Sequence, residues 1–327
     1  MENLPHPLAS PPWLDGRPKS GAATRFALVA KIVVSAALIV FLSRKLDWAA
    51  IGTRLEFATP APLISALFLM VIAIVCAAWR WRVLVRHAAA PLRMKTALQL
   101  TFAGMFFGQV LPATVGGDVV RGVLACRTGL PWRGVVAGIV LDRITALLAS
   151  ILLMFAGLPW LAARAVGASA PLLWTGLASG ALIVMVAVAL TLDHVPLPQA
   201  LARRSWLVSM QALVGQTRRG LASKAGIAAL AISLVIHLTT VVIVVLIGKS
   251  LGIIIPPLAG FLVVPLAIFA AAVPVSLNGW GIREGVMVTG FALFGIGGGD
   301  ALLVSVILGF SVIVAVLPGS LTWVALR

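Results

Sequence analysis

The most constraining feature of this sequence is a series of apolar runs, each long enough to cross the hydrocarbon core of a bilayer as a helix. A membrane-crossing helix needs about 17 to 25 apolar residues. Runs of that kind lie at about 26–43, 60–79, 134–157, 170–192, 225–248 and 302–325. Only 10% of the 327 residues are charged, whereas soluble domains carry about 25%. The chain is therefore predicted to be all-α, a polytopic integral membrane helix bundle with about six full spans.

The positive charge of the chain lies mainly between these spans. The 25 Lys and Arg residues outnumber the 9 Asp and Glu residues, which gives a formal net charge of +16. In a soluble protein this excess would indicate nucleic-acid binding. Membrane proteins collect Lys and Arg in cytoplasmic loops, so we predict no nucleic-acid partner. The most basic segments, 80–95 and 193–224, are predicted to be cytoplasmic, and this places both termini on the cytoplasmic side of the plasma (inner) membrane.

The chain divides into a tail and one domain. Residues 1–25 are polar and rich in proline, so they are predicted to form a disordered cytoplasmic tail. Residues 26–327 are predicted to form a single transmembrane domain. Cys76 and Cys126 are too few and too far apart to indicate a disulfide framework or a metal site, so we expect neither a metal nor a cofactor.

Two apolar segments, at about 96–132 and 250–300, must leave one face of the membrane and return to it if both basic segments are cytoplasmic. Each combines an apolar helix, a Pro/Gly break with an acid and an arginine, and a second short helix. The first break contains Pro112, Gly116, Gly117, Asp118 and Arg121, and the second contains Pro274, Asn278, Gly279, Gly281, Arg283 and Glu284. Irregular backbone at membrane depth must be buried in protein or line a wet cavity, so re-entrant or broken-helix hairpins are predicted. Ordinary kinked helices are the alternative.

The two predicted hairpins differ in direction. The first would open to the cytoplasm and the second to the outside, each flanked by one span on either side. This arrangement predicts an inverted repeat. Paired interrupted segments of this kind mark the binding site in secondary transporters.

Charged residues stand in or beside the apolar segments, where charge is costly. They are Asp118, Arg121, Asp142, Arg143, Arg283 and Glu284. Their charges sum to zero, as expected if they converge on one polar cavity. Asp118 and Arg121 are spaced i, i+3 and can pair on one helix face, but the adjacent Asp142 and Arg143 cannot face each other, so each needs a partner in another segment.

The breaks also present groups that can bind an anion. Gly116 and Gly117 precede a helix and expose backbone N–H groups at its positive end, and an arginine can grip a phosphate with two hydrogen bonds. The acids would favour an ammonium, so the set suits an amine-bearing phospholipid. The alternative is that these residues only cap helices and lock the hairpin tips. The candidate substrate-binding residues are Gly116, Gly117, Asp118, Arg121, Asp142, Arg143, Asn278, Gly279, Trp280, Arg283 and Glu284. No catalytic residue is assigned, and His237 is interpreted as a hydrogen-bonded core histidine rather than a proton relay.

Three elements of the sequence carry a resemblance. They are FFGQVLPATVGGDVVRG, LDRITALL and VPVSLNGWGIREG, in this order. The chain resembles the lysylphosphatidylglycerol synthase transmembrane-region family, a flippase-like module found alone or fused to a cytosolic aminoacyl-lipid transferase. The likeness covers most of residues 25–325. Gln109 stands where the family is expected to have asparagine. By position, the resemblance points to Pro112, Gly116, Gly117, Asp118 and Arg121 in the first element, to Asp142 and Arg143 in the second, and to Pro274, Gly279, Gly281, Arg283 and Glu284 in the third. It implies translocation of a lipid between leaflets.

We therefore expect a lipid flippase rather than an enzyme, with a phospholipid or glycolipid substrate, aminoacylated or glycosylated in some cases. The sequence has no Walker motif, so ATP is not expected to drive it. Because no soluble domain follows the last span, we do not expect lipid synthesis, and a separate lipid-modifying enzyme is a candidate partner. The alternatives are a transferase acting on lipid phosphates, an accessory subunit of a glycosyltransferase, and a small-solute secondary transporter.

Overall fold

The computed structural model describes residues 52–54, 56–88, 91–110, 116–164, 205–272 and 278–325, together with Val40, Gly180 and Thr191. The tail 1–25, the predicted spans at 26–43 and 170–192, and both Pro112 and Pro274 lie outside these described residues. Every regular element among the described residues is a helix.

Four helical stretches are long and apolar enough to cross a membrane, at Pro60–Ala88, Trp132–Gly157, Lys224–Ser250 and Gly298–Thr322. They correspond to helices α4 (Pro60–Ala88), α7 (Trp132–Arg164), α11 (Lys224–Ser250), and α14 (Gly298–Val316) with α15 (Pro318–Ala325). Four of the predicted spans are thus confirmed as apolar helices. The last one is two helices rather than one, since the helix is interrupted at Leu317, directly before Pro318, which lacks the N–H that would continue it.

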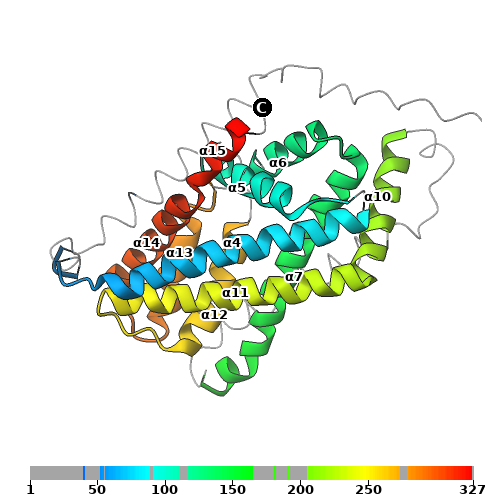
Figure 1. The fold of residues 1–327 in the computed structure, drawn as a ribbon. Helices are drawn as coiled ribbons and strands as arrows, with labels where there is room; N and C mark the ends of the chain where they lie inside the picture. The colour runs from blue at the N-terminus through cyan, green and yellow to red at the C-terminus, as the bar shows by residue number, and fades with distance from the viewer. Residues whose placement is uncertain are drawn as a thin grey trace, which may run out of the picture.

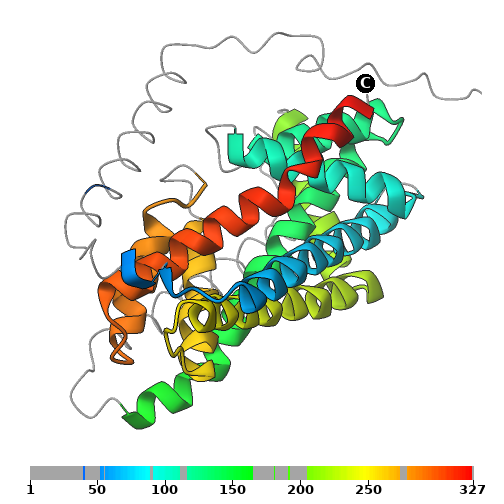
Figure 2. The same cartoon turned by 60° about the vertical axis from the view of Figure 1, so that its left-hand side comes forward.

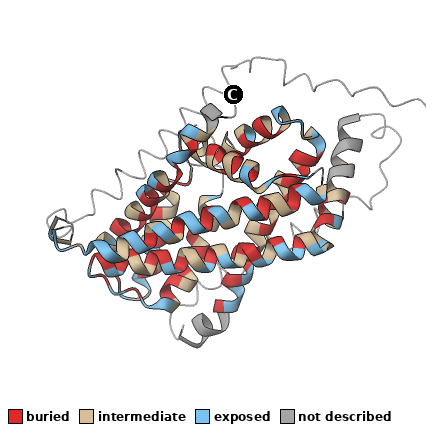
Figure 3. Ribbon diagram, in the orientation of Figure 1, coloured by how far each residue is buried: buried red, intermediate tan, exposed pale blue. Residues whose placement is uncertain are grey.

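The frame of the bundle is the pair α4 and α11, which lie side by side along their length (Figures 1 and 2). Figure 3 shows exposed positions recurring along both helices. Several of these exposed side chains are large and apolar, among them Phe68 on α4 and Val235 on α11. Lipid tails rather than water solvate such side chains in a membrane, so these outward faces fit contact with the bilayer.

Each predicted hairpin contains two short helices that pack against each other. The first pairs α5 (Met94–Val110) with α6 (Gly116–Arg127), and the second pairs α12 (Pro257–Ala271) with α13 (Ile282–Ala292). At about 1.5 Å per residue, none of these helices reaches the roughly 30 Å of a hydrocarbon core. Their opening directions and the inverted symmetry remain predictions from the loop charges.

The two hairpins pack on different stretches of α4. The first hairpin and the start of α7 surround the C-terminal part of α4 in one apolar cluster that contains Trp81 and Val85. The second hairpin and α14 pack with the N-terminal part of α4 and the C-terminal part of α11, in a larger cluster that contains Ala66 and Ile247. The bundle thus has one apolar cluster for each hairpin.

Glycines let the first hairpin close tightly. A Cβ on Gly117 of α6 would overlap the carbonyl oxygen of Gly104 and lie 3.1 Å from the Cα of Gly108, both on α5. Small residues four apart commonly allow membrane helices to approach this closely. On the other side of α5, a Cβ on Gly319 of α15 would overlap the carbonyl oxygen of Phe102. The helix α5 is therefore held by backbone contact on two sides.

The two basic segments predicted as loops are partly helical. Helix α4 continues to Ala88, so Arg80 and Arg82 lie within a helix rather than in a connecting loop. Within the segment 193–224, residues Ser205–Ala222 form helix α10, which packs on α7 and α11. Charge alone marked these segments as cytoplasmic, but it carries no information about where a helix ends.

Candidate functional site

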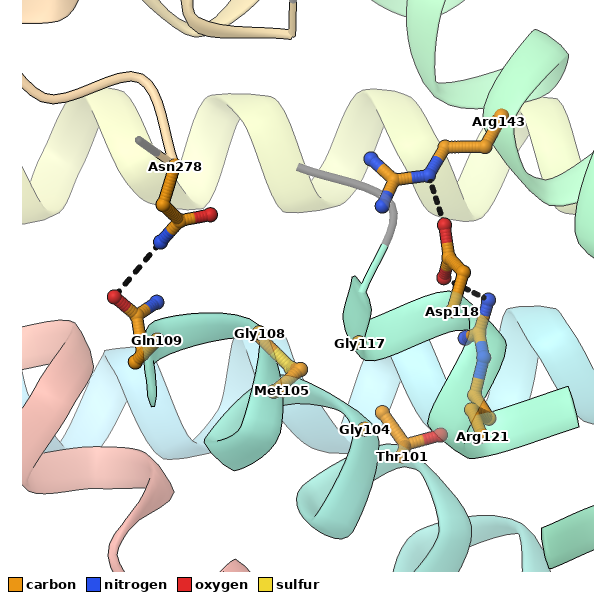
Figure 4. Close-up of a pocket in the computed structure, with 10 residues that line it drawn as sticks. All are labelled: Thr101, Gly104, Met105, Gly108, Gln109, Gly117, Asp118, Arg121, Arg143 and Asn278. Carbon is orange, nitrogen blue, oxygen red and sulfur yellow. Dashed lines mark hydrogen bonds and ion pairs between the residues drawn. The ribbon is translucent and has the colours of Figure 1, made fainter. Parts of the chain in front are cut away.

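A polar pocket of about 160 Å³ lies where the first hairpin meets the break of the second (Figure 4). It is lined by Thr101, Gly104, Met105, Gly108, Gln109, Gly117, Asp118, Arg121, Arg143 and Asn278. The two hairpins are joined directly, because the side-chain Nδ2 of Asn278 donates to Oε1 of Gln109, in the last turn of α5, over 2.7 Å. Asn278 holds a positive φ of 47°, a backbone conformation that asparagine adopts more readily than most residues. Gln109, at the position expected to be asparagine, thus contacts the second hairpin from the last turn of α5.

Asp118 and two arginines form one side of the pocket. The carboxylate Oδ1 accepts from Nη2 of Arg121 at 2.9 Å, and Oδ2 accepts from Nε of Arg143 at 2.5 Å. The predicted i, i+3 pairing of Asp118 with Arg121 is thus confirmed. Asp118 is in the first turn of α6, where the helix dipole also favours a negative charge.

Asp142 lies on α7 behind this wall and is 4% exposed. Its Oδ1 accepts from Nε of Arg80 at 2.7 Å, and its Oδ2 accepts from Nη2 of Arg121 at 3.1 Å. Arg80 also donates to the hydroxyl of Ser233 on α11 at 3.0 Å. The inference that Asp142 and Arg143 each need a partner in another segment is therefore correct.

From the sequence, Arg80 is predicted only as a cytoplasmic charge, so its role in this network is an addition from the structure. Arg80 is 9% exposed and lies on the buried face of α4, among Ala78, Trp81 and Leu84. If the helical repeat of apolar positions is continued beyond residue 79, position 80 falls on that buried face. This repeat is the sequence signal that could have identified Arg80.

Four helices contribute to this network, and its charge is not balanced. The arginines at 80, 121 and 143 face the carboxylates at 118 and 142, which leaves a surplus of one positive charge. Arg121 also stacks its guanidinium over the ring of Trp81, 4.6 Å from the centroid. Unlike the other four, the Arg143 side chain is 53% exposed, and its guanidinium extends toward the pocket (Figure 4). Because Arg143 is half-exposed, the surplus charge is accessible to water or to a ligand in the pocket.

The charges of the second hairpin form a separate and local cluster. Glu284, 1% exposed, accepts from the backbone N–H of Gly281 at 2.6 Å and from Nη2 of Arg283 at 2.5 Å. Nε of Arg283 also donates to the hydroxyl of Ser305 on α14 at 3.2 Å. Trp280 lies beneath Arg283, with the guanidinium 4.9 Å from the ring centroid. These groups close the first turn of α13 and fasten it to α14.

The expectation that all six charges converge on one cavity is therefore wrong. Asp118, Arg121, Asp142 and Arg143 form one network, whereas Arg283 and Glu284 pair with each other. Those two residues, like Trp280 and Gly279, are not in the lining of the pocket. Gly279 has a φ of 80° and packs so closely on Ala271 that a Cβ would overlap it. For the second hairpin, the geometry fits the alternative in which these residues lock the tip.

His237 has the structural environment expected of a core histidine. It is 5% exposed on α11, and its Nε2 is 3.0 Å from both the hydroxyl of Ser150 and the carbonyl oxygen of Ala146 on α7. It therefore ties α11 to α7 away from the residues that line the pocket.

Comparison with known proteins agrees with this architecture. The family model described as Lysylphosphatidylglycerol synthase TM region matches residues 28–319. No curated protein matches the chain. The matched range covers both hairpins and every residue of the charge network, so the chain belongs to the Lysylphosphatidylglycerol synthase TM region family, whose description indicates a membrane protein with a lipid-related function.

Proposed function

We propose that this protein moves a phosphate-bearing lipid between the leaflets of the membrane without direct use of ATP. The observation that carries the proposal is the polar pocket between the two hairpin breaks, bordered by a charge network with one surplus positive charge. A lipid phosphodiester carries one negative charge. Its binding would neutralise the network, and this removes the cost of holding an uncompensated charge in the bilayer.

The proposed binding mode uses Arg143 and the start of α6. Arg143 uses only Nε in its ion pair with Asp118, so the rest of its guanidinium fork can bind phosphate oxygens. Gly117 lines the pocket in the first turn of α6, where backbone N–H groups at a helix N-terminus favour an anion. The acyl chains would stay in the bilayer while the head group passes between the hairpins.

The test is a leaflet-exchange assay with the purified full-length chain in phosphatidylcholine vesicles that contain a trace of acyl-labelled phosphatidylglycerol. Dithionite bleaches the label in the outer leaflet, and lipid movement exposes the protected inner pool. We expect faster loss of the inner pool with the wild-type protein than with empty vesicles. Arg143→Ala should abolish the difference. Arg133→Ala is the matched control, since Arg133 lies on the same helix, is exposed and is outside the pocket lining.

Three results would contradict the proposal. Equal bleaching of vesicles with the wild-type protein and of empty vesicles would contradict the flippase function. Full activity of Arg143→Ala would contradict the assignment of this pocket as the lipid site. Uptake of labelled glycerol phosphate without lipid movement would instead support the small-solute transporter. A parallel measurement of dye leakage ensures that bleaching reports lipid movement and not permeable vesicles.

A further inference from the structure

The carboxylates beside the pocket are already paired with arginines. Both oxygens of Asp118 accept from arginines, Oδ1 from Arg121 and Oδ2 from Arg143. Both oxygens of Asp142 do the same, Oδ1 from Arg80 and Oδ2 from Arg121. An incoming ammonium would have to share these carboxylates with the arginines that they neutralise, which weakens the ion pairs of buried side chains.

Donor groups are in surplus at the same place. Nε of Arg121 and the hydroxyl of Thr101 are buried without a hydrogen-bond partner, and both residues line the pocket. Within the described part of the chain, Arg143 donates to Asp118 through Nε, and its terminal nitrogens point into the space between Asn278 and Gly117 (Figure 4). Among the described lining residues, the charged groups with unused hydrogen-bonding capacity are thus arginine donors, which favour phosphate and hydroxyl oxygens.

We infer that the pocket selects a lipid whose head group is net anionic, with a single phosphodiester and uncharged hydroxyl-bearing groups, and rejects aminoacylated or other cationic head groups. This inference rests on the proposed function, because it names the substrate class of the same pocket. It replaces the sequence-based expectation of an amine-bearing phospholipid. That expectation depended on free acids at 118 and 284, and Glu284 is engaged by Arg283 and by the backbone of Gly281.

The direct test is binding. Purified full-length protein in a neutral detergent is titrated with three lipids that carry the same acyl chains: phosphatidylglycerol, phosphatidylethanolamine and lysylphosphatidylglycerol. Bound lipid is counted by native mass spectrometry. A unit charge a few ångströms from the head group makes the affinity for an anion more than tenfold higher than that for a cation, even with an effective dielectric constant near 20. Phosphatidylglycerol should therefore bind at least about tenfold more tightly than the lysyl lipid. Equal binding, or tighter binding of the lysyl lipid, would overturn the inference.

A charge series at one position gives a second, independent readout. Arg143→Gln removes the surplus charge and should reduce the preference for phosphatidylglycerol over the lysyl lipid to within a few-fold. Arg143→Glu changes the charge by two units and should invert the preference. The side chain at 143 is 53% exposed, so these variants are expected to fold, and Arg133→Gln is the control that should keep the wild-type preference. An unchanged preference in both Arg143 variants would overturn the inference.

The same lipids in the vesicle assay separate this inference from the proposed function. If no lipid moves but phosphatidylglycerol still binds preferentially, the flippase function is wrong and the charge selectivity stands. If all three lipids move and bind equally, the flippase function stands and the charge selectivity is wrong.

Discussion

The salt bridge between Arg80 and Asp142 offers the sharpest test of the charge network. Arg80→Met removes one positive charge but leaves Asp142 bound to Arg121 at 3.1 Å. In Asp142→Leu, Arg80 keeps its hydrogen bond to the Ser233 hydroxyl but loses its carboxylate partner. Asp118 is then the carboxylate that remains in the network with its three arginines. Breaking a buried ion pair costs about 3 to 5 kcal/mol when one charge remains uncompensated. We therefore expect Asp142→Leu to lower the free energy of unfolding by that amount and Arg80→Met by about half of it.

The double variant distinguishes pairing from general loss of packing. Arg80→Met with Asp142→Leu restores the surplus to one positive charge and leaves Arg121 bound to Asp118. We expect the double variant to be more stable than Asp142→Leu alone, with a coupling energy within the range of about 0.5 to 3 kcal/mol found for contacting residues.

The measurement is the free energy of unfolding in mixed micelles, obtained by titration with a denaturing detergent and followed by tryptophan fluorescence. Arg86→Met is the control, since Arg86 is an exposed arginine on the same helix and should leave the free energy of unfolding unchanged within error. Additive losses in the double variant, or a loss below about 1 kcal/mol for Asp142→Leu, would refute the claim that these charges are held by mutual pairing.

Three further predictions test the hairpins. Gly117→Ala should destabilise the protein by about 1 to 3 kcal/mol, because its Cβ would overlap the backbone of α5; the thermal melting of Gly285→Ala, where a Cβ meets nothing within 4 Å, is the control. Arg283→Ala should lower thermal stability together with any transport, because it leaves a carboxylate that is 1% exposed without its arginine; loss of transport with unchanged melting would show that this arginine binds substrate. In a chain freed of native cysteines, a cysteine at Thr128 should react with an impermeant maleimide from the cytoplasm and one at Gly298 from outside, and reaction from the same side would contradict the inverted hairpins.

Local spacing predicted part of the charge network. Residues three apart on a helix share a face, so the pairing of Asp118 with Arg121 could be read from the sequence. Adjacent residues diverge on a helix, so Asp142 and Arg143 had to have partners elsewhere. The identity of those partners depends on which helices pack together, and spacing within one helix does not contain that information. Helical phase within α4 marks Arg80 as buried, but it does not name Asp142 as its partner.

The adjacent pair Arg283 and Glu284 shows where the same spacing rule fails. These two side chains do meet, with Nη2 of Arg283 at 2.5 Å from the carboxylate. They lie in the first turn of α13, where Glu284 reaches back to the free N–H of the N-cap residue Gly281. This backward reach brings the carboxylate under the arginine. Facing rules derived from helix interiors therefore do not hold at a helix start, where capping decides the direction of the side chain.

The two hairpins thus differ in how their charges restrain motion. The first hairpin is tied to α7 through the ion pairs of Asp118 with Arg143 and of Arg121 with Asp142, so moving it as a body breaks charged contacts at membrane depth. The second hairpin keeps its charged pair within itself and α14, and among the described residues its hydrogen bond to the first hairpin is a neutral amide pair, which contributes only about 1 kcal/mol. Separating the two hairpins at the pocket therefore breaks no ion pair among the described residues, although it disturbs the apolar cluster that the second hairpin shares with α4, α11 and α14. A lipid phosphate bound at Arg143 would then have the ion-paired arginines of the charge network on one side and the uncharged amide of Asn278 on the other.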